Sequence, residues 1–181
     1  MALPVFALLV VAEVLYTHSQ GRNAYALKEF AGSMSQLCIN SLVRLAIGGG
    51  LVSLHFFLFG FRVFEVPNTV WGWVLTFVVI DFVFYWYHRA QHRVRFMWCA
   101  HVVHHSSEHM NLGTALRQSP TGPFTRALFY WPLPLLGFHP LVLAGAGALA
   151  TIYAFFTHTE VLKKLWAPLE WWLVTPSHHR A

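Results

Sequence analysis

The stretch Asp81-Phe-Val-Phe-Tyr85-Trp-Tyr-His88-Arg-Ala-Gln-His92 runs from an apolar, aromatic segment into two histidines. Its polar positions are separated by four, three and four residues, so they share one face of an α-helix while aromatic side chains fill the other faces. His88 and His92 lie one turn apart and are predicted to bind the same metal ion, because imidazole is the commonest side-chain metal ligand. Asp81, two turns deeper, is predicted to accept a hydrogen bond that orients an imidazole. For either histidine alone, the alternative is an interfacial residue at a helix end.

A second histidine group, His101-Val-Val-His104-His105, follows nine residues after His92. At 100° per residue, nine residues place the two groups half a turn out of phase on a straight helix. One helix could not aim both groups at one point. The chain is therefore predicted to turn between Arg93 and Ala100 and to bring a second helix back toward the first.

Three more candidate ligands lie toward the C-terminus. His158 follows an apolar run and, taken alone, would be an interfacial residue; the other groups favour a metal ligand. His178 and His179 follow Thr175-Pro-Ser, a helix-entry turn. Adjacent residues on a helix diverge by 100°, so one of this pair is expected to face the metal. The other histidines are predicted to be surface, interface or packing residues: His18, His55, His109 and His139.

The number of candidate ligands exceeds the three protein ligands that hold a catalytic zinc, and it favours two metal ions. Imidazole suits iron, copper, nickel and zinc alike, so the ligand type does not identify the metal. The sequence contains neither a His-Glu-x-x-His motif nor a nucleophile elbow. These features favour redox metal chemistry over hydrolysis.

Composition indicates where this chemistry takes place. The chain is 56% hydrophobic and 10% charged, with a mean hydropathy of +0.50, whereas soluble domains carry roughly 25% charged residues. We therefore expect an all-α integral membrane protein, a helical bundle with a histidine-rich metal-binding cap, forming a single domain over residues 1–181. The net charge of +5 is spread over scattered cations without a basic, aromatic stripe, so no nucleic-acid partner is predicted.

Apolar runs define the expected helices. A spanning helix needs about 20 residues, a length that Cys38–Phe59 and Val70–Tyr87 approach or exceed and that Ala2–Tyr16 does not. Leu128–Phe138 contains two prolines, which break a regular helix. Leu141–Phe156 is short, with Gly145 and Gly147 favouring close helix contact. The last two runs form either a re-entrant hairpin or a spanning helix with a bent entry; both alternatives stay open.

Cations at the segment ends predict the orientation. Most of them flank the histidine-bearing regions, whereas the short loop at 61–68 carries one arginine against one glutamate. Because cytoplasmic loops are enriched in Lys and Arg, the histidine groups are predicted to face the cytoplasm. The cations are Arg22, Lys28, Arg89, Arg93, Arg95, Lys163 and Lys164.

Five runs together resemble the fatty acid hydroxylase / sterol desaturase superfamily of membrane di-iron oxygenases, over about residues 71–181. They are Asp81 to His92, Trp98-Cys-Ala-His101-Val-Val-His104-His105-Ser-Ser, Asn111-Leu-Gly-Thr-Ala-Leu-Arg-Gln118, Phe156-Thr-His158-Thr and Thr175-Pro-Ser-His178-His179-Arg180.

The resemblance implies a centre of two Fe ions that uses O₂ as co-substrate and a separate electron donor. The substrate would be a sterol, fatty acyl or alkylglycerol-like lipid that is hydroxylated or desaturated. A bacterial inner membrane is the expected location. The implied metal ligands are His88, His92, His101, His104, His105, His158, His178 and His179; His178 matches the family motif less well than His179.

One departure from the family pattern lies at the end of the sequence. The family motif continues His-His-Arg-x-His-His, whereas this sequence ends at Ala181. We therefore expect the family region to be incomplete at its C-terminus. The alternative function is a truncated, non-catalytic metal-binding membrane protein.

Overall fold

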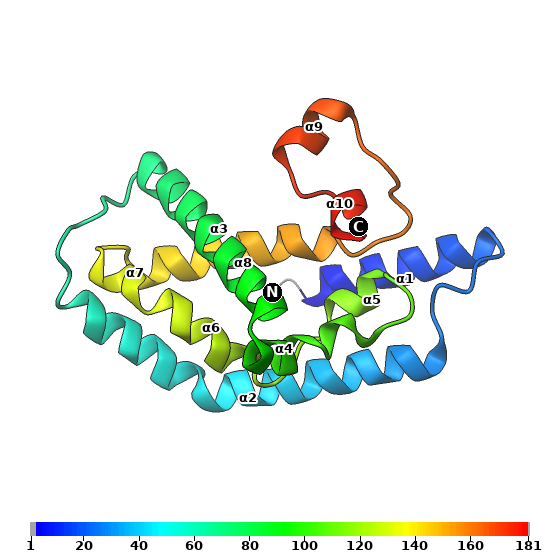
Figure 1. Ribbon diagram of the computed structural model, residues 1–181, viewed down its shortest axis with the longest axis horizontal. Coiled ribbons are helices and arrows are strands. Elements are labelled where there is room, and N and C mark those ends of the chain that lie inside the picture. Colours follow the sequence, from blue (N-terminus) through cyan, green and yellow to red (C-terminus); the bar gives the residue numbers. More distant parts are fainter. Residues whose placement is uncertain (1–2, 181) are drawn as a thin grey trace. The chain divides into compact units, whose positions relative to one another are not determined.

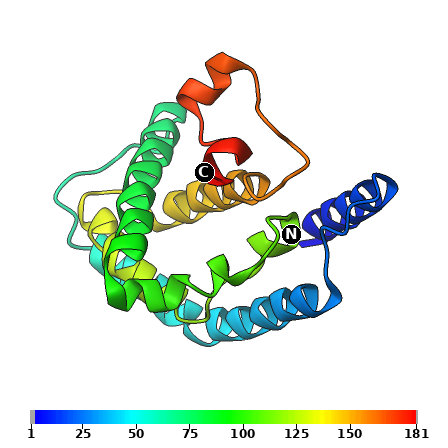
Figure 2. The same cartoon turned by 45° about the vertical axis from the view of Figure 1, so that its right-hand side comes forward.

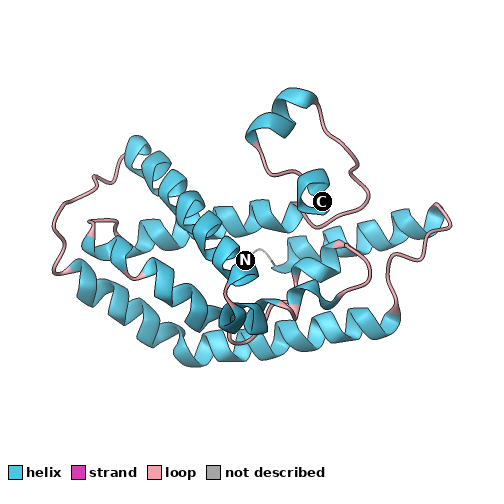
Figure 3. Ribbon diagram, viewed as in Figure 1, coloured by secondary structure: helices cyan, strands magenta, loops and turns pink. Residues whose placement is uncertain are grey.

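The computed structural model describes residues 3–180, and this range contains helices and no strand (Figures 1 and 3). The predicted all-α fold class is therefore confirmed. The helices are α1 (Leu3–Ser19), α2 (Leu27–Phe59), α3 (Val70–Arg93), α4 (Arg95–His101), the 3₁₀ turn η1 (His104–Ser106), α5 (Leu112–Ala115), α6 (Gly122–Tyr130), α7 (Pro132–Leu135), α8 (Pro140–Phe156), α9 (Ala167–Trp172) and α10 (Pro176–Arg180).

Two of these helices, α2 and α3, are long and apolar enough to cross a membrane. Both exceed the predicted runs: α2 begins at Leu27 rather than Cys38, and α3 continues to Arg93 rather than Tyr87. The added residues are mixed in polarity but contain no proline, so the helices extend beyond their apolar parts. The helices α1 and α8 have 17 residues each, fewer than the roughly 20 that a straight crossing needs.

The chain divides into two compact units, each assembled from separate stretches of sequence. The first unit comprises the residues up to Leu37, His104–Gln118 and the residues from Tyr153 onward. The second unit comprises Cys38–Val103 and Ser119–Ile152. The single membrane domain expected from the sequence stays a prediction.

Within the second unit, α3 packs against the helices of the proline-containing region. The core consists of Ile80 from α3, Leu133 from α7, Phe138 just before α8, and Leu143 and Ala146 within α8. The two prolines of the predicted interruption both lie in α7, whose first residue is a proline. Because proline lacks a backbone N–H, it is tolerated at the start of a helix, where that donor would have no partner.

Gly145 and Gly147 of α8 were both expected to allow another helix to approach closely, and this contact occurs at Gly145. An ideal Cβ on Gly145 would lie 2.6 Å from the indole ring of Trp73 on α3, so only glycine allows the observed approach. At Gly147 no described atom lies within 4 Å of such a Cβ. The prediction is thus confirmed at Gly145, and Gly147 faces open space.

Gly137 provides a stability test because two constraints coincide there. Its φ is +94°, and an added Cβ would lie 2.3 Å from the carbonyl oxygen of Phe64. We expect Gly137→Ala to lower the free energy of unfolding by at least about 1–2 kcal/mol, the cost of the left-handed conformation alone. Thermal unfolding in detergent measures the loss. Gly147→Ala is the matched control and should unfold at or above the wild-type temperature, since alanine favours a helix; equal melting of both variants would contradict the prediction.

Within the first unit, α1 packs against α5 and the end of α8. Val10, Leu112 and Phe155 form its buried apolar cluster, and the ring of Phe6 stacks on that of Phe155 with centroids 4.2 Å apart. Asn111 caps α5 by accepting a hydrogen bond from the backbone N–H of Thr114. The apolar cluster therefore fixes the chain soon after His104 and His105, at Leu112, and just before His158, at Phe155.

Candidate metal centre

Three histidines of the second unit meet at a bend between α3 and α4. The helix α3 ends at Arg93, α4 begins at Arg95, and Val94 between them is extended, with φ −101° and ψ 116°. The predicted turn between Arg93 and Ala100 is confirmed. It brings His101, at the end of α4, back to the two histidines of α3; His88, His92 and His101 are called the α3–α4 trio.

The geometry of the α3–α4 trio suits a metal ion. The Nε2 atoms of His88 and His92 are 3.2 Å apart, and the ring centroid of His101 lies 4.8 Å from each of the other two. His101 is buried, whereas His92 is exposed and borders a hollow lined by Arg93, Val94, Arg95 and Trp98. One histidine of the trio, His101, is therefore shielded from solvent, whereas another, His92, can be reached from solvent.

Three histidines of the first unit form a second group, the His158 trio. The Nε2 atom of His158 lies 2.9 Å from that of His104 and 3.1 Å from that of His179. Figure 2 shows how the chain after α8 loops out through α9 and returns, so that α10 lies beside the segment that follows α8. His104 and His158 are buried, and His179 is half-buried.

Backbone carbonyls hold two rings of the His158 trio in the form that binds metal. Nδ1 of His158 lies 2.7 Å from the carbonyl oxygen of Ala154, and Nδ1 of His104 lies 3.2 Å from that of Arg117. An Nδ1–H that donates to a carbonyl leaves the Nε2 lone pair for a ligand. Burial, with a smaller contribution from His104 and His179, lowers the pKa of His158 to about 2, so its ring is neutral at physiological pH.

The spacing of these nitrogens fits one metal ion at each trio. Two imidazole nitrogens bound at right angles to an ion, each about 2.1 Å from it, would be about 3.0 Å apart. The measured Nε2 separations are 2.9, 3.1 and 3.2 Å. All-imidazole donor sets suit iron among other transition metals, and three ligands leave positions open for a further ligand.

A family model for fatty acid hydroxylase matches residues 73–181, which include all six histidines of the two trios. The chain belongs to the fatty acid hydroxylase family. Alkylglycerol monooxygenase from Homo sapiens is 42% identical over 174 residues, covering 95% of this chain and 38% of the relative. The enzymes of the same name from Danio rerio and Xenopus tropicalis are 38% and 36% identical and cover 99% and 97% of this chain, against 40% and 39% of their own lengths.

The chain thus spans about two-fifths of the length of the curated relatives that it matches. No solved structure matches it. These relatives are named monooxygenases, and the names print alkylglycerol as what they act on.

Three residues predicted for the site are not members of either trio: His105, His178 and Asp81. His105 is exposed in η1, with its ring centroid 5.2 Å from that of His104. His178 is exposed, and its Nε2 lies 3.3 Å from a carboxylate oxygen of Glu170. Of the adjacent pair, His179 joins the trio, as the 100° divergence requires. Asp81 is exposed and forms no hydrogen bond with a histidine in the described range, so its orienting role stays a prediction.

Arg117, a functional residue that no histidine spacing indicates, holds the segment that carries His104. Its guanidinium is buried and donates to Ser33 Oγ at 3.1 Å, to Ser106 Oγ at 3.2 Å and to the carbonyl oxygen of Glu29 at 2.7 Å. The carbonyl of the same residue holds the ring of His104. Arg117 therefore fixes the ring through its own backbone.

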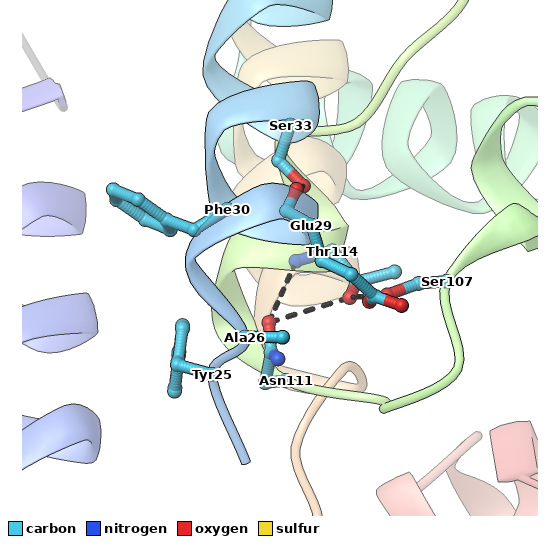
Figure 4. Close-up of a pocket in the computed structure, with 8 residues that line it drawn as sticks. All are labelled: Tyr25, Ala26, Glu29, Phe30, Ser33, Ser107, Asn111 and Thr114. Carbon is cyan, nitrogen blue, oxygen red and sulfur yellow. Dashed lines mark hydrogen bonds between the residues drawn. The ribbon is translucent and has the colours of Figure 1, made fainter. Parts of the chain in front are cut away.

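The same segment is tied to the first turns of α2 by a polar cluster. Figure 4 shows Glu29 and Ser33 of α2 beside Ser107, Asn111 and Thr114. Glu29 accepts a hydrogen bond from Ser107 Oγ at 2.6 Å, and Asn111 accepts one from Thr114. The contact between Glu29 and Ser107 joins residues 78 positions apart, so periodicity in the sequence gave no sign of it.

Glu170 holds the other end of the His158 trio. Its carboxylate accepts from the backbone N–H of Leu165 at 2.7 Å, from Thr175 Oγ1 at 3.0 Å and from Ser177 Oγ at 2.6 Å. The hydrogen bond from Ser177 is the main cause that lowers the pKa of Glu170, so the group is a carboxylate at neutral pH. These bonds close the loop that enters α10 and thereby place His179.

Proposed function

We propose that this chain is an iron-dependent monooxygenase that binds two Fe ions, one at each trio, and oxidises the alkyl chain of an alkylglycerol-like lipid. The observation that carries the proposal is the His158 trio. Three Nε2 atoms converge at 2.9 and 3.1 Å, and backbone carbonyls hold two of the rings in the metal-binding tautomer. The substrate class is taken from the names of the relatives.

Bound iron would activate O₂ so that one oxygen atom enters a C–H bond and the other leaves as water, with two electrons and two protons from a separate donor. The chain's own residues orient the ligands and exclude water. His101, His104 and His158 are buried, so the lone pairs that face the metal are shielded from solvent. His105 and His178 stay candidate ligands from the sequence prediction.

The apolar helices would present the lipid to the site. Large apolar side chains are exposed along α3, among them Phe82 and Trp86, so this helix offers a lipid-facing surface that runs toward His88. Arg89, Arg93 and Arg95 are exposed at the histidine-bearing end. We propose that this end faces the cytoplasm, where cations at helix ends are enriched; a bacterial inner membrane stays a prediction from the sequence.

The test is turnover of a 1-O-alkylglycerol by the 181-residue chain in detergent micelles, with Fe(II), ¹⁸O₂ and ascorbate as the electron source. We expect O₂-dependent product that contains one ¹⁸O atom, detected by mass spectrometry. A desaturated product without ¹⁸O would replace hydroxylation by desaturation, and oxygen derived from water would contradict an oxygenase. Two bound irons without turnover would favour the alternative, a non-catalytic metal-binding membrane protein.

A further inference from the structure

Glu13 is a buried carboxylate in an apolar helix, and it lies outside the region matched by the family model. It is the only charged residue in α1 apart from the histidine in the last turn, and only 6% of it is exposed. No salt bridge neutralises it within residues 3–180. Burying an ionised carboxylate is costly unless hydrogen bonds compensate, so its partners indicate what it does.

Three donors from three different segments converge on Glu13. The backbone N–H of Leu112 donates to Oε2 at 2.8 Å, the Tyr25 hydroxyl donates to the same oxygen, and the Thr159 hydroxyl donates to Oε1. Burial and the hydrogen bond to Glu13 raise the pKa of Tyr25, so its hydroxyl keeps the proton that it donates. Glu13 therefore joins α1 to the chain before α2, to the start of α5 and to the segment after α8.

Thr159 connects Glu13 to two ligands of the His158 trio. Thr159 directly follows His158, so a hydrogen bond that fixes its side chain also fixes the backbone of that histidine. The carbonyl oxygen of Thr159 accepts a hydrogen bond from the guanidinium of Arg180, the residue that directly follows His179. Thr159 is thus held by Glu13 of α1 through its hydroxyl, and it bonds Arg180 through its carbonyl, so it contacts the chain next to both His158 and His179.

Leu112 provides a third connection. It is the first residue of α5, and the chain that continues from it reaches Arg117, whose carbonyl oxygen holds the ring of His104. The Glu13 carboxylate thus bonds Thr159, which is next to His158 in the chain. It also bonds Leu112, at the start of the segment whose Arg117 orients His104.

We propose that Glu13 is a positioning residue for the His158 trio: its buried carboxylate fixes Thr159 and Leu112 and so sets where the three Nε2 atoms meet. The inference rests on the proposed function for its iron, but the arrangement of the rings can be measured without metal. A purely structural contact would stabilise the fold without changing the metal affinity of the trio.

The metal test uses Fe(II) alone and the full chain carrying His101→Ala, in which the α3–α4 trio lacks one ligand and the His158 trio is intact. We expect Glu13→Ala to weaken Fe(II) binding by about 10–100-fold, the usual loss when a partner that orients a ligand is removed. Glu13→Gln keeps an acceptor for Leu112 and should restore binding to within a few-fold. Glu160→Gln is the matched control, because the Glu160 carboxylate accepts hydrogen bonds from Met110 N and Arg22 rather than from Thr159 and Leu112.

The metal-free test is the rate at which diethyl pyrocarbonate modifies His158, mapped by mass spectrometry in the chain without iron. We expect about a 10-fold faster reaction in Glu13→Ala, since the buried ring loses its support, and no change in Glu160→Gln. If Glu13→Ala does not fold, Thr159→Val replaces the hydroxyl that donates to Glu13 with a methyl group of similar size and should give the same two effects. Folded variants with unchanged Fe(II) affinity and unchanged modification would overturn the proposal. If the wild-type chain binds no iron, while His158 still reacts faster in Glu13→Ala and at an unchanged rate in Glu160→Gln, the proposed function is refuted and the positioning role is supported.

Discussion

Replacing His158 with alanine is expected to lower the iron content from two ions to one per chain. His158 is the central member of its trio, with its Nε2 2.9 Å from that of His104 and 3.1 Å from that of His179. Its removal leaves two ligands, fewer than the three that hold a catalytic metal in most protein sites. Iron measured by atomic absorption against protein concentration gives the stoichiometry directly.

His178→Ala is the matched control for this experiment. It removes an imidazole from the same α10 helix, but one that lies beside Glu170 and not beside His158. We expect this variant to keep two irons. Equal iron loss in both variants would mean that the arrangement of α10 described above does not exist in solution.

His101→Ala is expected to abolish oxidation of an alkylglycerol, with a loss of more than about 100-fold. Removal of a residue that only orients a ligand commonly costs about 10–100-fold, so removal of a buried ligand costs more. His101 is the buried member of the α3–α4 trio, where the proposed function places one of the two iron ions. Product formation per chain, measured by mass spectrometry, tests the prediction.

Asp81→Asn, compared with His101→Ala, tests whether Asp81 orients an imidazole. From the sequence we predicted that Asp81 orients an imidazole, whereas its side chain is exposed and no hydrogen bond joins it to a histidine in the described range. The geometry therefore leads us to expect less than about a threefold change in turnover. A loss as large as that of His101→Ala would restore the sequence prediction and place Asp81 closer to the metal than the structure has it.

Helical phase explains why part of the candidate metal site could be predicted. The four-residue spacing of His88 and His92 is a local property, and the half-turn mismatch to His101 requires a bend, which the structure has at Val94. The 100° divergence of adjacent residues predicted that one of His178 and His179 would join the site. Periodicity did not decide which one, because that choice depends on the contact between His178 and Glu170.

The surroundings of the His158 trio could not be predicted in this way. Glu13, Arg117 and Glu170 act through hydrogen bonds whose partners are fixed by tertiary packing; Glu13 and Thr159, for example, are separated by 146 residues. The sequence held one sign of this, a single acidic residue in the otherwise apolar α1, and buried carboxylates of this kind call for partners. The prediction for α2 began too late, at Cys38, because the polar residues Ser33, Ser35 and Gln36 end the apolar run without ending the helix.

The decisive measurement is the iron content of the wild-type 181-residue chain, purified after loading with Fe(II) and removal of excess metal. We expect two iron ions per chain, one held by each trio. Zero or one iron per folded chain would contradict it.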